Sequence, residues 1–311
     1  MIIQEWIPLS DKNWFKTGGP ARFFCQPINQ TELQYACQWA NKHNQPLFIL
    51  GEGANILISD QGFDGLVIQP HLITIELIDQ NKDTVYVTIG AGLSMDQAIE
   101  WCLAHNIIGL EEFSGIPGTI GGSIYINLHY YQFLLEHFLH NAQILDIQTS
   151  KISTVSKEWF NFGYNQSKLQ EKTHILLNAT FTLKKVSDLA IAYARGRRTE
   201  IIRHRSARYP NKNTCGSFFR NFHEDEVTLI SNGKKMIYVA YYLDKIGAKG
   251  TLQVGDAIVS YQHANMLVNK GNATSKDIID LAFMMQQKVY EIFGIVPKPE
   301  CQVIGFRDNP L

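Results

Sequence analysis

The sequence lacks several features that would place it outside ordinary globular proteins. It contains no uninterrupted apolar run near the roughly 18 residues that a membrane-spanning helix needs. It has 28 basic and 29 acidic residues, so its net charge of −1 offers no general attraction to nucleic acid. Residues 1–6 show neither the basic nor the apolar region of a secretory signal. We therefore expect a cytoplasmic protein that binds neither membranes nor nucleic acid.

Cysteine is also scarce, and its placement argues against a disulfide framework. The five cysteines are scattered, odd in number and not spaced as metal-binding or redox motifs. Reduced thiols are therefore expected, as is usual in the cytosol. The histidines at positions 129, 137 and 140 have no acidic or cysteine partner at a metal-ligand spacing, so we interpret them as structural or exposed. No metal site is predicted.

Glycine, by contrast, is concentrated in two short loops. Residues 114–122 read Ser-Gly-Ile-Pro-Gly-Thr-Ile-Gly-Gly, and residues 51–55 read Gly-Glu-Gly-Ala-Asn. An isolated pair of glycines most often marks a surface turn. Here the density of glycine is high and apolar residues flank both loops. Glycine lets the backbone come close to a ligand, and free N–H groups with hydroxyls suit phosphate. The two loops together favour a ligand with two phosphates.

The hydrophobic pattern predicts a mixture of helices and strands in two or three subdomains. The chain has 311 residues, which is beyond the size that one core usually serves. An apolar strand is expected at residues 46–50 and an alternating strand at 84–90, and residues 142–147 and 174–183 are further strands. The first of these is not followed by a GxGxxG motif and a helix, which counts against the usual dinucleotide-binding fold.

Several helices and connections are expected from end signals and periodicity. Helices are predicted from a cap at Thr31, from a cap at Ser94 or Asp96, over residues 192–208, over residues 236–246, and along the apolar stripe that follows residues 273–277. We expect a strand that ends at Asn127 after the second glycine loop, and a candidate helix over residues 128–139. The arginines of the segment 192–208 are interpreted as a solvated face, with contact to phosphate as the less favoured alternative.

A series of motifs in order along residues 13–305 resembles the UDP-N-acetylenolpyruvoylglucosamine reductase (MurB) family, in its shorter subtype. The strongest are Gly-Gly-Pro-Ala at 18–21, the two glycine loops, Gly-Ser followed by Phe-Arg-Asn at 216–221, and His-Ala-Asn at 263–265. The resemblance implies an α+β protein. Its two-subdomain FAD-binding fold, of the MurB or vanillyl-alcohol-oxidase type, would be followed by a C-terminal α+β substrate-binding domain. We assign these parts to residues 1–72, 73–190 and 191–311.

The resemblance also implies an activity. Family members reduce UDP-N-acetylglucosamine enolpyruvate to UDP-N-acetylmuramate with FAD and NADPH, in peptidoglycan precursor synthesis for cell-wall growth and division. The expected partner is thus a small UDP-sugar, and we expect a monomer. The resemblance identifies Ser217 as the proton donor and Glu300 as the carboxylate near it. The remaining predicted site residues are, for the cofactor, Gly51, Glu52, Gly53, Ala54, Asn55, Ile56, Leu57, Ser114, Gly115, Ile116, Pro117, Gly118, Thr119, Gly121 and Gly122, and, for the substrate, Tyr164, Arg220, Asn221, His263 and Asn265.

The sequence departs from the family pattern mainly at substrate positions. Asn165 stands where the family has the arginine expected to face the substrate carboxylate, so it is a doubtful member of the catalytic set. The family's Ala-Gly-Ala after Asn127 is replaced by Leu-His-Tyr, and its later Gly by Gln132. Gly-Gly-Ala-Gln is replaced by residues 255–258, Gly-Asp-Ala-Ile. Two hypotheses therefore remain: a working reductase of this family, or a flavin-binding protein of the same fold with an altered substrate or lost catalysis.

Overall fold

The structure, a computed structural model, describes all 311 residues and is of the α+β class. The chain divides into two compact units. Unit 1 comprises residues 1–5, 23–52 and 65–205, and unit 2 comprises residues 6–22, 53–64 and 206–311. The functional division into residues 1–72, 73–190 and 191–311 is a different partition and stays a prediction.

The centre of unit 1 is a six-stranded antiparallel sheet. Its strands are Ile75–Asn81 (β6), Thr84–Gly90 (β7), Ile107–Ile108 (β8), Leu139–Asp146 (β11), Ile152–Ser156 (β12) and His174–Lys185 (β13). The order is β12-β11-β13-β7-β6, and β8 pairs with β13 as well. Along β7, Val85, Val87 and Ile89 are fully buried, whereas the residues between them are partly exposed. The predicted alternation is thus confirmed, because one face of the strand packs into the core.

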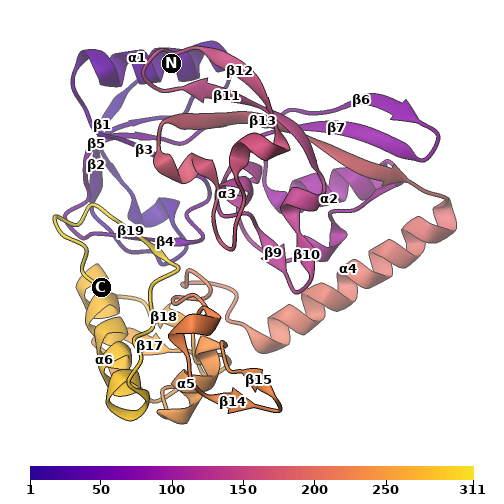
Figure 1. The fold of residues 1–311 in the computed structure, drawn as a ribbon. Helices are drawn as coiled ribbons and strands as arrows, with labels where there is room; N and C mark the ends of the chain where they lie inside the picture. Colours follow the sequence, from indigo (N-terminus) through magenta and orange to yellow (C-terminus); the bar gives the residue numbers. More distant parts are fainter. The chain divides into compact units, whose positions relative to one another are not determined.

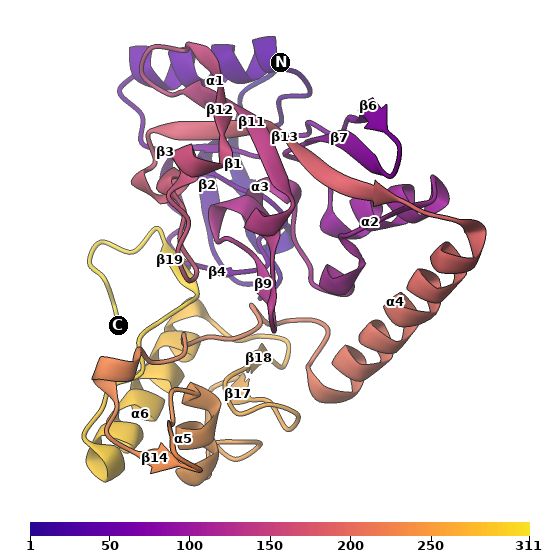
Figure 2. The ribbon, with the colours of Figure 1, turned by 45° about the vertical axis from the view of Figure 1, so that its right-hand side comes forward.

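Helices surround this sheet and begin where polar side chains cap them. Unit 1 contains Gln30–Lys42 (α1), Met95–Ala104 (α2), Ile120–Tyr125 (α3) and most of Asp188–Arg208 (α4). Figures 1 and 2 show β13 leading into α4, which continues as one long helix. The side chain of Ser94 caps α2 together with Gln97, as predicted. The cap of α1 is Asn29, whose side chain accepts from the Glu32 amide, so the predicted cap at Thr31 is wrong by two residues.

Two predicted elements after the second glycine loop are wrong. The expected strand up to Asn127 is instead α3, because Thr119 caps a turn that buries Ile120, Ser123 and Ile124 at helical spacing. The candidate helix over residues 128–139 is instead a hairpin of His129–Tyr130 (β9) and Phe133–Leu134 (β10), followed by a short 3-10 helix. At its turn Tyr131 has a φ of 51°, which a helix does not allow.

Short strands and 3-10 helices occur in both units. A further sheet has the order β1-β2-β5-β3, in which β3 and β5 run parallel. These strands are Gln4–Pro8 (β1), Pro20–Cys25 (β2), Leu47–Ile49 (β3) and Phe63–Ile68 (β5). The 3-10 helices are Ser10–Lys12 (η1), Glu111–Phe113 (η2), Leu135–His137 (η3), Lys157–Phe160 (η4), Lys168–Glu171 (η5) and Glu224–Glu226 (η6).

Unit 2 is built around the long helix Ser275–Phe293 (α6). Of its predicted apolar stripe, Ile278, Leu281, Met285 and Val289 are fully buried, whereas Ile292 is 62% exposed. Thr274 and Asp277 form a capping box, and Gly294 ends the helix at a φ of 69°. The other elements are Val239–Lys245 (α5), Ile56–Ile58 (β4), Ile230–Ser231 (β14), Lys234–Lys235 (β15), Gln253–Val254 (β16), Ala257–Val259 (β17), Leu267–Asn269 (β18) and Gln302–Ile304 (β19). The last strand pairs in parallel with β4, so the end of the chain joins the segment that follows the first glycine loop.

The turn at Gly62 supports a stability prediction. Gly62 has a φ of 80°, and a Cβ there would lie 1.9 Å from the carbonyl oxygen of Pro20. Gly233 has a similar φ of 75° but open space around the corresponding position. We expect Gly62→Ala to lower the free energy of unfolding by at least about 4 kcal/mol, and Gly233→Ala by only about 1 kcal/mol. Urea denaturation of both variants separates the cost of the backbone clash from the cost of the positive φ. Equal losses of unfolding free energy in the two variants would contradict this prediction.

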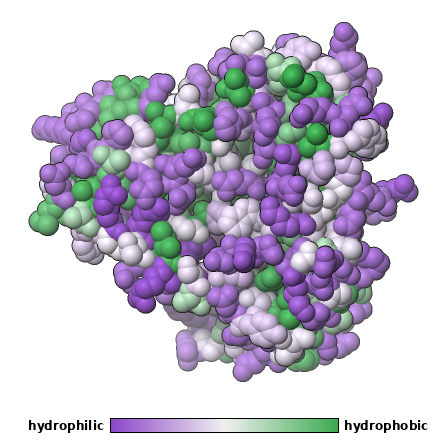
Figure 3. All heavy atoms as spheres, turned by 180° about the vertical axis from the view of Figure 1, so that it is seen from behind, coloured by the Kyte–Doolittle hydropathy of each residue, from purple (hydrophilic) through white to green (hydrophobic).

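No helix of the structure is both long and apolar enough to cross a membrane. On the face shown in Figure 3, apolar residues occur in small groups among polar ones.

Candidate functional site

The first glycine loop comprises residues 51–55, and its residues Gly51 and Glu52 lie in unit 1, shortly after β3. The carbonyl oxygen of Gly51 accepts a hydrogen bond of 2.9 Å from the side chain of Gln69. A Cβ at Gly51 would lie 2.7 Å from the hydroxyl oxygen of Thr119, in the second glycine loop. Glycine is therefore required because the two loops touch here. The structure thus brings together the two segments that the sequence singled out as a phosphate cradle.

The second glycine loop, residues 114–122, is held by its neighbours on both sides. Its Gly118 carbonyl accepts from the Met95 amide at 2.9 Å, and Thr119 pairs with Ser94 at the start of α2. Gly118 has a φ of 136°, and no heavy atom lies within 4 Å of the place where its Cβ would be. Glycine is thus required there by conformation, and it leaves an unfilled space on that side of the loop.

Glu52 joins the two loops. Its carboxylate oxygen Oε2 accepts a hydrogen bond of 3.0 Å from the Gly118 amide. Burial raises the pKa of the Glu52 carboxyl, the hydrogen bond from Gly118 partly opposes this, and the nearby Asp96 raises the pKa further. Glu52 forms no salt bridge. The Glu52 carboxylate, which has no cationic partner, thus accepts the hydrogen bond of one amide in the predicted phosphate-binding loops.

The remaining residues of the first glycine loop, from Gly53 onward, belong to unit 2. Gly53 has a φ of 68°, and a Cβ there would lie 2.6 Å from the backbone of Asn13. The side-chain oxygen of Asn55 is buried without a hydrogen-bond partner. Ile56 and Leu57 are buried in β4, where they pair with β19. These two residues thus belong to the core, whereas Asn55 offers an unused acceptor.

These residues fit the flavin dinucleotide that the family resemblance implies. Two glycine-rich loops approach each other within van der Waals distance at Gly51, and the open side of Gly118 gives room for a ligand. The hydroxyl of Thr119 is a donor of the kind that binds diphosphate. Most amides of the second loop donate to acceptors within the structure. The orphaned oxygen of Asn55 is a costly feature unless a ligand or water donates to it. The negative charge of Glu52 is the one feature that opposes an anionic ligand.

Ser217 and Glu300, the two residues predicted to deliver a proton, lie on adjacent backbone segments of unit 2. The amide of Glu300 donates to the carbonyl of Phe218 at 2.8 Å, and Ser217 pairs with Met266. The hydroxyl of Ser217 makes no hydrogen bond within the structure. Gly216, just before it, has a φ of 78°. The structure therefore brings the two segments together and leaves the serine hydroxyl available to a ligand.

Two buried thiols flank this pair. Cys215 lies two residues before Ser217, and Cys301 follows Glu300. Burial raises the pKa of the Cys215 thiol, and its contact with Cys301 raises it further. The Cys215 thiol therefore stays protonated and neutral near neutral pH.

Tyr164 and Asn165 lie in a tight turn of unit 1, between Gly163 and Gln166. The Asn165 carbonyl accepts from the side chain of Gln170, which also donates to the carbonyl of Tyr125 at the end of α3. Asn165 has a φ of 55°, and both polar atoms of its side chain are buried without a partner. The ring of Tyr164 is 5.1 Å from that of His129. The turn is thus fixed to α3, while the Asn165 amide is left unsatisfied.

The predicted substrate residues Arg220 and Asn221 have partners within unit 2. The guanidinium of Arg220 forms two hydrogen bonds of 2.7 Å with the carboxylate of Glu226, which Lys298 also contacts at 2.7 Å. Arg220, with Lys298, holds the pKa of Glu226 well below its usual range. The side-chain oxygen of Asn221 accepts from the Val239 amide, at the start of α5. Both residues stabilise the fold, which the sequence alone does not reveal.

His263 and Asn265 also take part in internal hydrogen bonds. The Asn265 side chain bonds both the amide and the carbonyl of Phe219, at 3.0 and 2.7 Å. Nδ1 of His263 accepts from the Asn265 amide at 3.2 Å, and burial lowers the pKa of His263. This network fixes the segment that follows Ser217. A role in substrate binding stays a prediction for all four residues.

The sequence missed the function of the arginines on α4. Arg198, only 11% exposed, bonds Asp96 and Glu100 of α2, and Arg197 forms two hydrogen bonds with Glu112. Nε of Arg205 donates to the carbonyl of Gly115 at 3.1 Å. The expected solvated face is confirmed for Arg195, Arg197, Arg203 and Arg208, which are exposed, and is wrong for Arg198 and Arg205, which are partly buried. The contacts of Arg197, Arg198 and Arg205 hold the second glycine loop and its flanking elements. No local sequence signal marks partners so distant in the chain.

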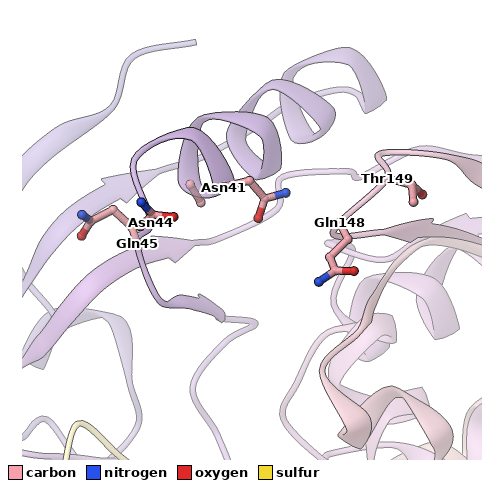
Figure 4. Close-up of a pocket in the computed structure, with 6 residues that line it drawn as sticks. Asn41, Asn44, Gln45, Gln148 and Thr149 are labelled. Atoms are coloured by element: carbon pink, nitrogen blue, oxygen red, sulfur yellow. The ribbon is translucent and has the colours of Figure 1, made fainter.

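A separate open pocket in unit 1 carries none of the predicted site residues. It lies at the end of α1 and is lined by Ala40, Asn41, Asn44, Gln45, Gln148 and Thr149. Figure 4 shows its amide side chains. One of them, that of Asn41, donates to the Ile147 carbonyl at 2.8 Å. The lining has no charged group, so the pocket is a poor candidate for a diphosphate.

Comparison with protein-family models gives two matches. Residues 209–304 match the model described as UDP-N-acetylenolpyruvoylglucosamine reductase, C-terminal domain. Residues 21–156 match the FAD binding domain. The second match includes both glycine loops, and the first includes Ser217 and Glu300.

Individual relatives extend the similarity to almost the whole chain. The UDP-N-acetylenolpyruvoylglucosamine reductase of Synechococcus sp. (strain JA-3-3Ab) is 31% identical over 310 residues, which cover 99% of this chain and 93% of the relative. That of Lactobacillus johnsonii is 32% identical, with 97% and 95% covered. The crystal structure of the reductase from Thermus caldophilus matches with a TM-score of 0.78 at 25% identity, over 97% of this chain and 100% of that one.

Proposed function

Because this chain belongs to the UDP-N-acetylenolpyruvoylglucosamine reductase family, we propose that it reduces UDP-N-acetylglucosamine enolpyruvate to UDP-N-acetylmuramate, with FAD and NADPH, in peptidoglycan precursor synthesis. The observation that carries the proposal is the contact of two glycine loops at Gly51 and Thr119, inside a chain similar to these reductases over nearly its whole length.

The proposed mechanism assigns a distinct task to each group of residues. Bound FAD would supply the transfer of a hydride from NADPH to the double bond of the substrate. Residues 51–55 and 114–119 would hold its diphosphate. Ser217 gives a proton to the carbon next to the one that receives the hydride. Serine is a poor acid by itself, so the Glu300 carboxylate on the adjacent segment is proposed to orient and polarise it.

Asn165 supports the alternative, a flavin-binding protein of this family with an altered substrate or lost catalysis. Charge that develops on the substrate carboxylate needs stabilisation, and an arginine supplies more of it than a neutral amide can. Here the amide atoms of Asn165 are buried and lack a partner. The side chain can hydrogen-bond a substrate group after a small movement of the turn, but it brings no charge.

The proposal includes a monomer in the cytoplasm. All five cysteines are free and buried, as suits a reducing compartment. Light scattering during gel filtration measures the mass of the particle. The mass of a dimer would contradict the proposed monomer and leave the proposed activity unchanged.

An anaerobic titration tests the function. Purified protein reconstituted with FAD is mixed with NADPH and then with UDP-N-acetylglucosamine enolpyruvate, while the flavin absorbance is followed. A working reductase bleaches with NADPH and regains its yellow colour with the substrate. Bleaching without recovery supports the alternative. Protein that does not bind FAD would contradict both.

A further inference from the structure

The link between Glu52 and Gly118 points to control of flavin binding by a single acidic side chain. The Glu52 carboxylate accepts from the amide of Gly118, in the middle of the loop proposed to hold the diphosphate. Both residues lie in unit 1, as do the neighbours of this contact at Gly51 and Thr119. The carboxylate thus lies where an anionic ligand is expected to bind.

The surroundings of Glu52 make its charge unfavourable. The side chain forms no salt bridge, and the nearest acidic group, Asp96 on α2, is itself paired with Arg198 of α4. The arginine therefore neutralises Asp96 and not Glu52. Burial favours the neutral form of the Glu52 carboxyl and raises its pKa. A doubly negative diphosphate brought next to Glu52 repels the carboxylate and so favours its neutral form further.

We propose that Glu52 is a positioning residue with two opposed effects, in which its hydrogen bond to Gly118 holds the cradle in shape and its negative charge weakens the binding of FAD. Protonation of Glu52 removes the second effect, because the phosphodiester groups of FAD stay ionised across the neutral range. Binding of FAD is therefore coupled to uptake of a proton. This inference rests on the proposed function only in assuming that FAD is the ligand.

The sign of the pH dependence follows from this coupling. The complex raises the pKa of Glu52 above its value in the free protein, because the diphosphate disfavours the charged form. FAD affinity is then highest below the pKa that Glu52 has in the free protein, and it falls as the pH rises through that pKa. The fall is at most about tenfold per pH unit, since one proton is involved. Asp96, the charged group that acts on Glu52 from α2, is paired with Arg198 of α4.

Three variants separate the two effects. Glu52→Gln keeps an oxygen that accepts from Gly118 but carries no charge. It is expected to bind FAD roughly tenfold more tightly than the wild type at pH 8, with no dependence on pH. Glu52→Ala loses both charge and hydrogen bond, so its affinity lies below that of Glu52→Gln at every pH. Glu76→Gln, on the exposed strand β6, removes one carboxylate elsewhere in unit 1 and should match the wild type.

Calorimetric titration of the apoprotein with FAD measures these effects without any reference to turnover. Experiments in phosphate and in Tris buffer give the number of protons taken up, because the two buffers differ in ionisation enthalpy. We expect fractional proton uptake for the wild type and for Glu76→Gln, and none for Glu52→Gln. Equal affinity and equal proton uptake in the wild type and Glu52→Gln would overturn the inference, as would weaker binding by Glu52→Gln at every pH.

The same titration distinguishes this inference from the proposed function. If the wild type and all variants fail to bind FAD, the proposed function itself is lost. If all bind FAD with the same affinity and proton count, the function stands and Glu52 has no such role. Circular dichroism of each apoprotein shows whether a loss of affinity reflects a loss of fold.

Discussion

Replacing Ser217 by alanine is expected to leave reduction of the flavin by NADPH unchanged and to slow its reoxidation by the enolpyruvyl substrate by roughly 10²–10⁴-fold, the usual contribution of a positioned proton donor. The serine hydroxyl makes no hydrogen bond within the structure, so its loss leaves no internal group unsatisfied. The fold should therefore tolerate the change. Rapid mixing under anaerobic conditions follows the two half-reactions separately.

A second serine in the same unit provides the control for this variant. Ser231 lies on the exposed strand β14, and Ser231→Ala should leave both half-reactions at the wild-type rate. If Ser217→Ala reoxidises as fast as the wild type, Ser217 does not donate the proton. Reduction by NADPH that slows equally with reoxidation would instead indicate damage to the flavin site.

Elements that depend on local signals are the ones that the sequence predicts well. The alternation of β7 follows from one buried face, and α6 follows from a stripe of apolar residues between a capping box and a glycine. The glycine loops were also recognisable, because close approach at Gly51 and the positive φ of Gly118 exclude other residues. For β7, α6 and Gly118 the constraint acts within a few neighbouring residues, whereas the glycine at Gly51 marks a contact with the distant Thr119.

The errors arise where individual hydrogen bonds decide between similar local propensities. Residues 120–126 contain isoleucines that suit a strand as well as a helix. The helix forms because Thr119 accepts from the Gly122 amide, and the Gly121 amide bonds the Ala91 carbonyl. Likewise, the hairpin of β9 and β10 is closed by a backbone bond between Leu128 and Leu135. Propensity alone cannot choose between these outcomes.

The arginines of α4 show the same limit at the level of function. Arg197 and Arg198 bond acidic groups 85 to 102 positions away in the chain, so no spacing rule indicates the pairs. The motif residues Asn221 and Asn265 show the converse. A motif match marks them as part of a site. In the structure the Asn265 side chain bonds the backbone of Phe219, close to Ser217, and the Asn221 side chain accepts from the Val239 amide at the start of α5. The resemblance thus marks these positions, and the structure adds the internal contacts that their side chains make.

Asn165→Arg is expected to accelerate reoxidation of the reduced flavin by the enolpyruvyl substrate. The variant restores the cation that the family resemblance places opposite the substrate carboxylate. A hydrogen bond to a charged group contributes about 1.5–3 kcal/mol, which corresponds to a gain of roughly 10- to 100-fold. The change also removes an amide whose two polar atoms are buried without partners, which limits its cost to the fold. Stopped-flow absorbance at saturating substrate measures the gain.

Asn161→Arg is the matched control, since Asn161 is also an asparagine with positive φ, at 45°, and lies exposed a few residues earlier. It adds the same charge and the same backbone strain, away from the Asn165 turn, and should not alter the rate. A gain in Asn165→Arg alone shows that the missing cation limits turnover of this substrate. If neither variant gains, another group already supplies the charge or the protein has a different substrate. Recovery of the oxidised flavin by the unmodified protein decides between these two, because only a working reductase regains its colour.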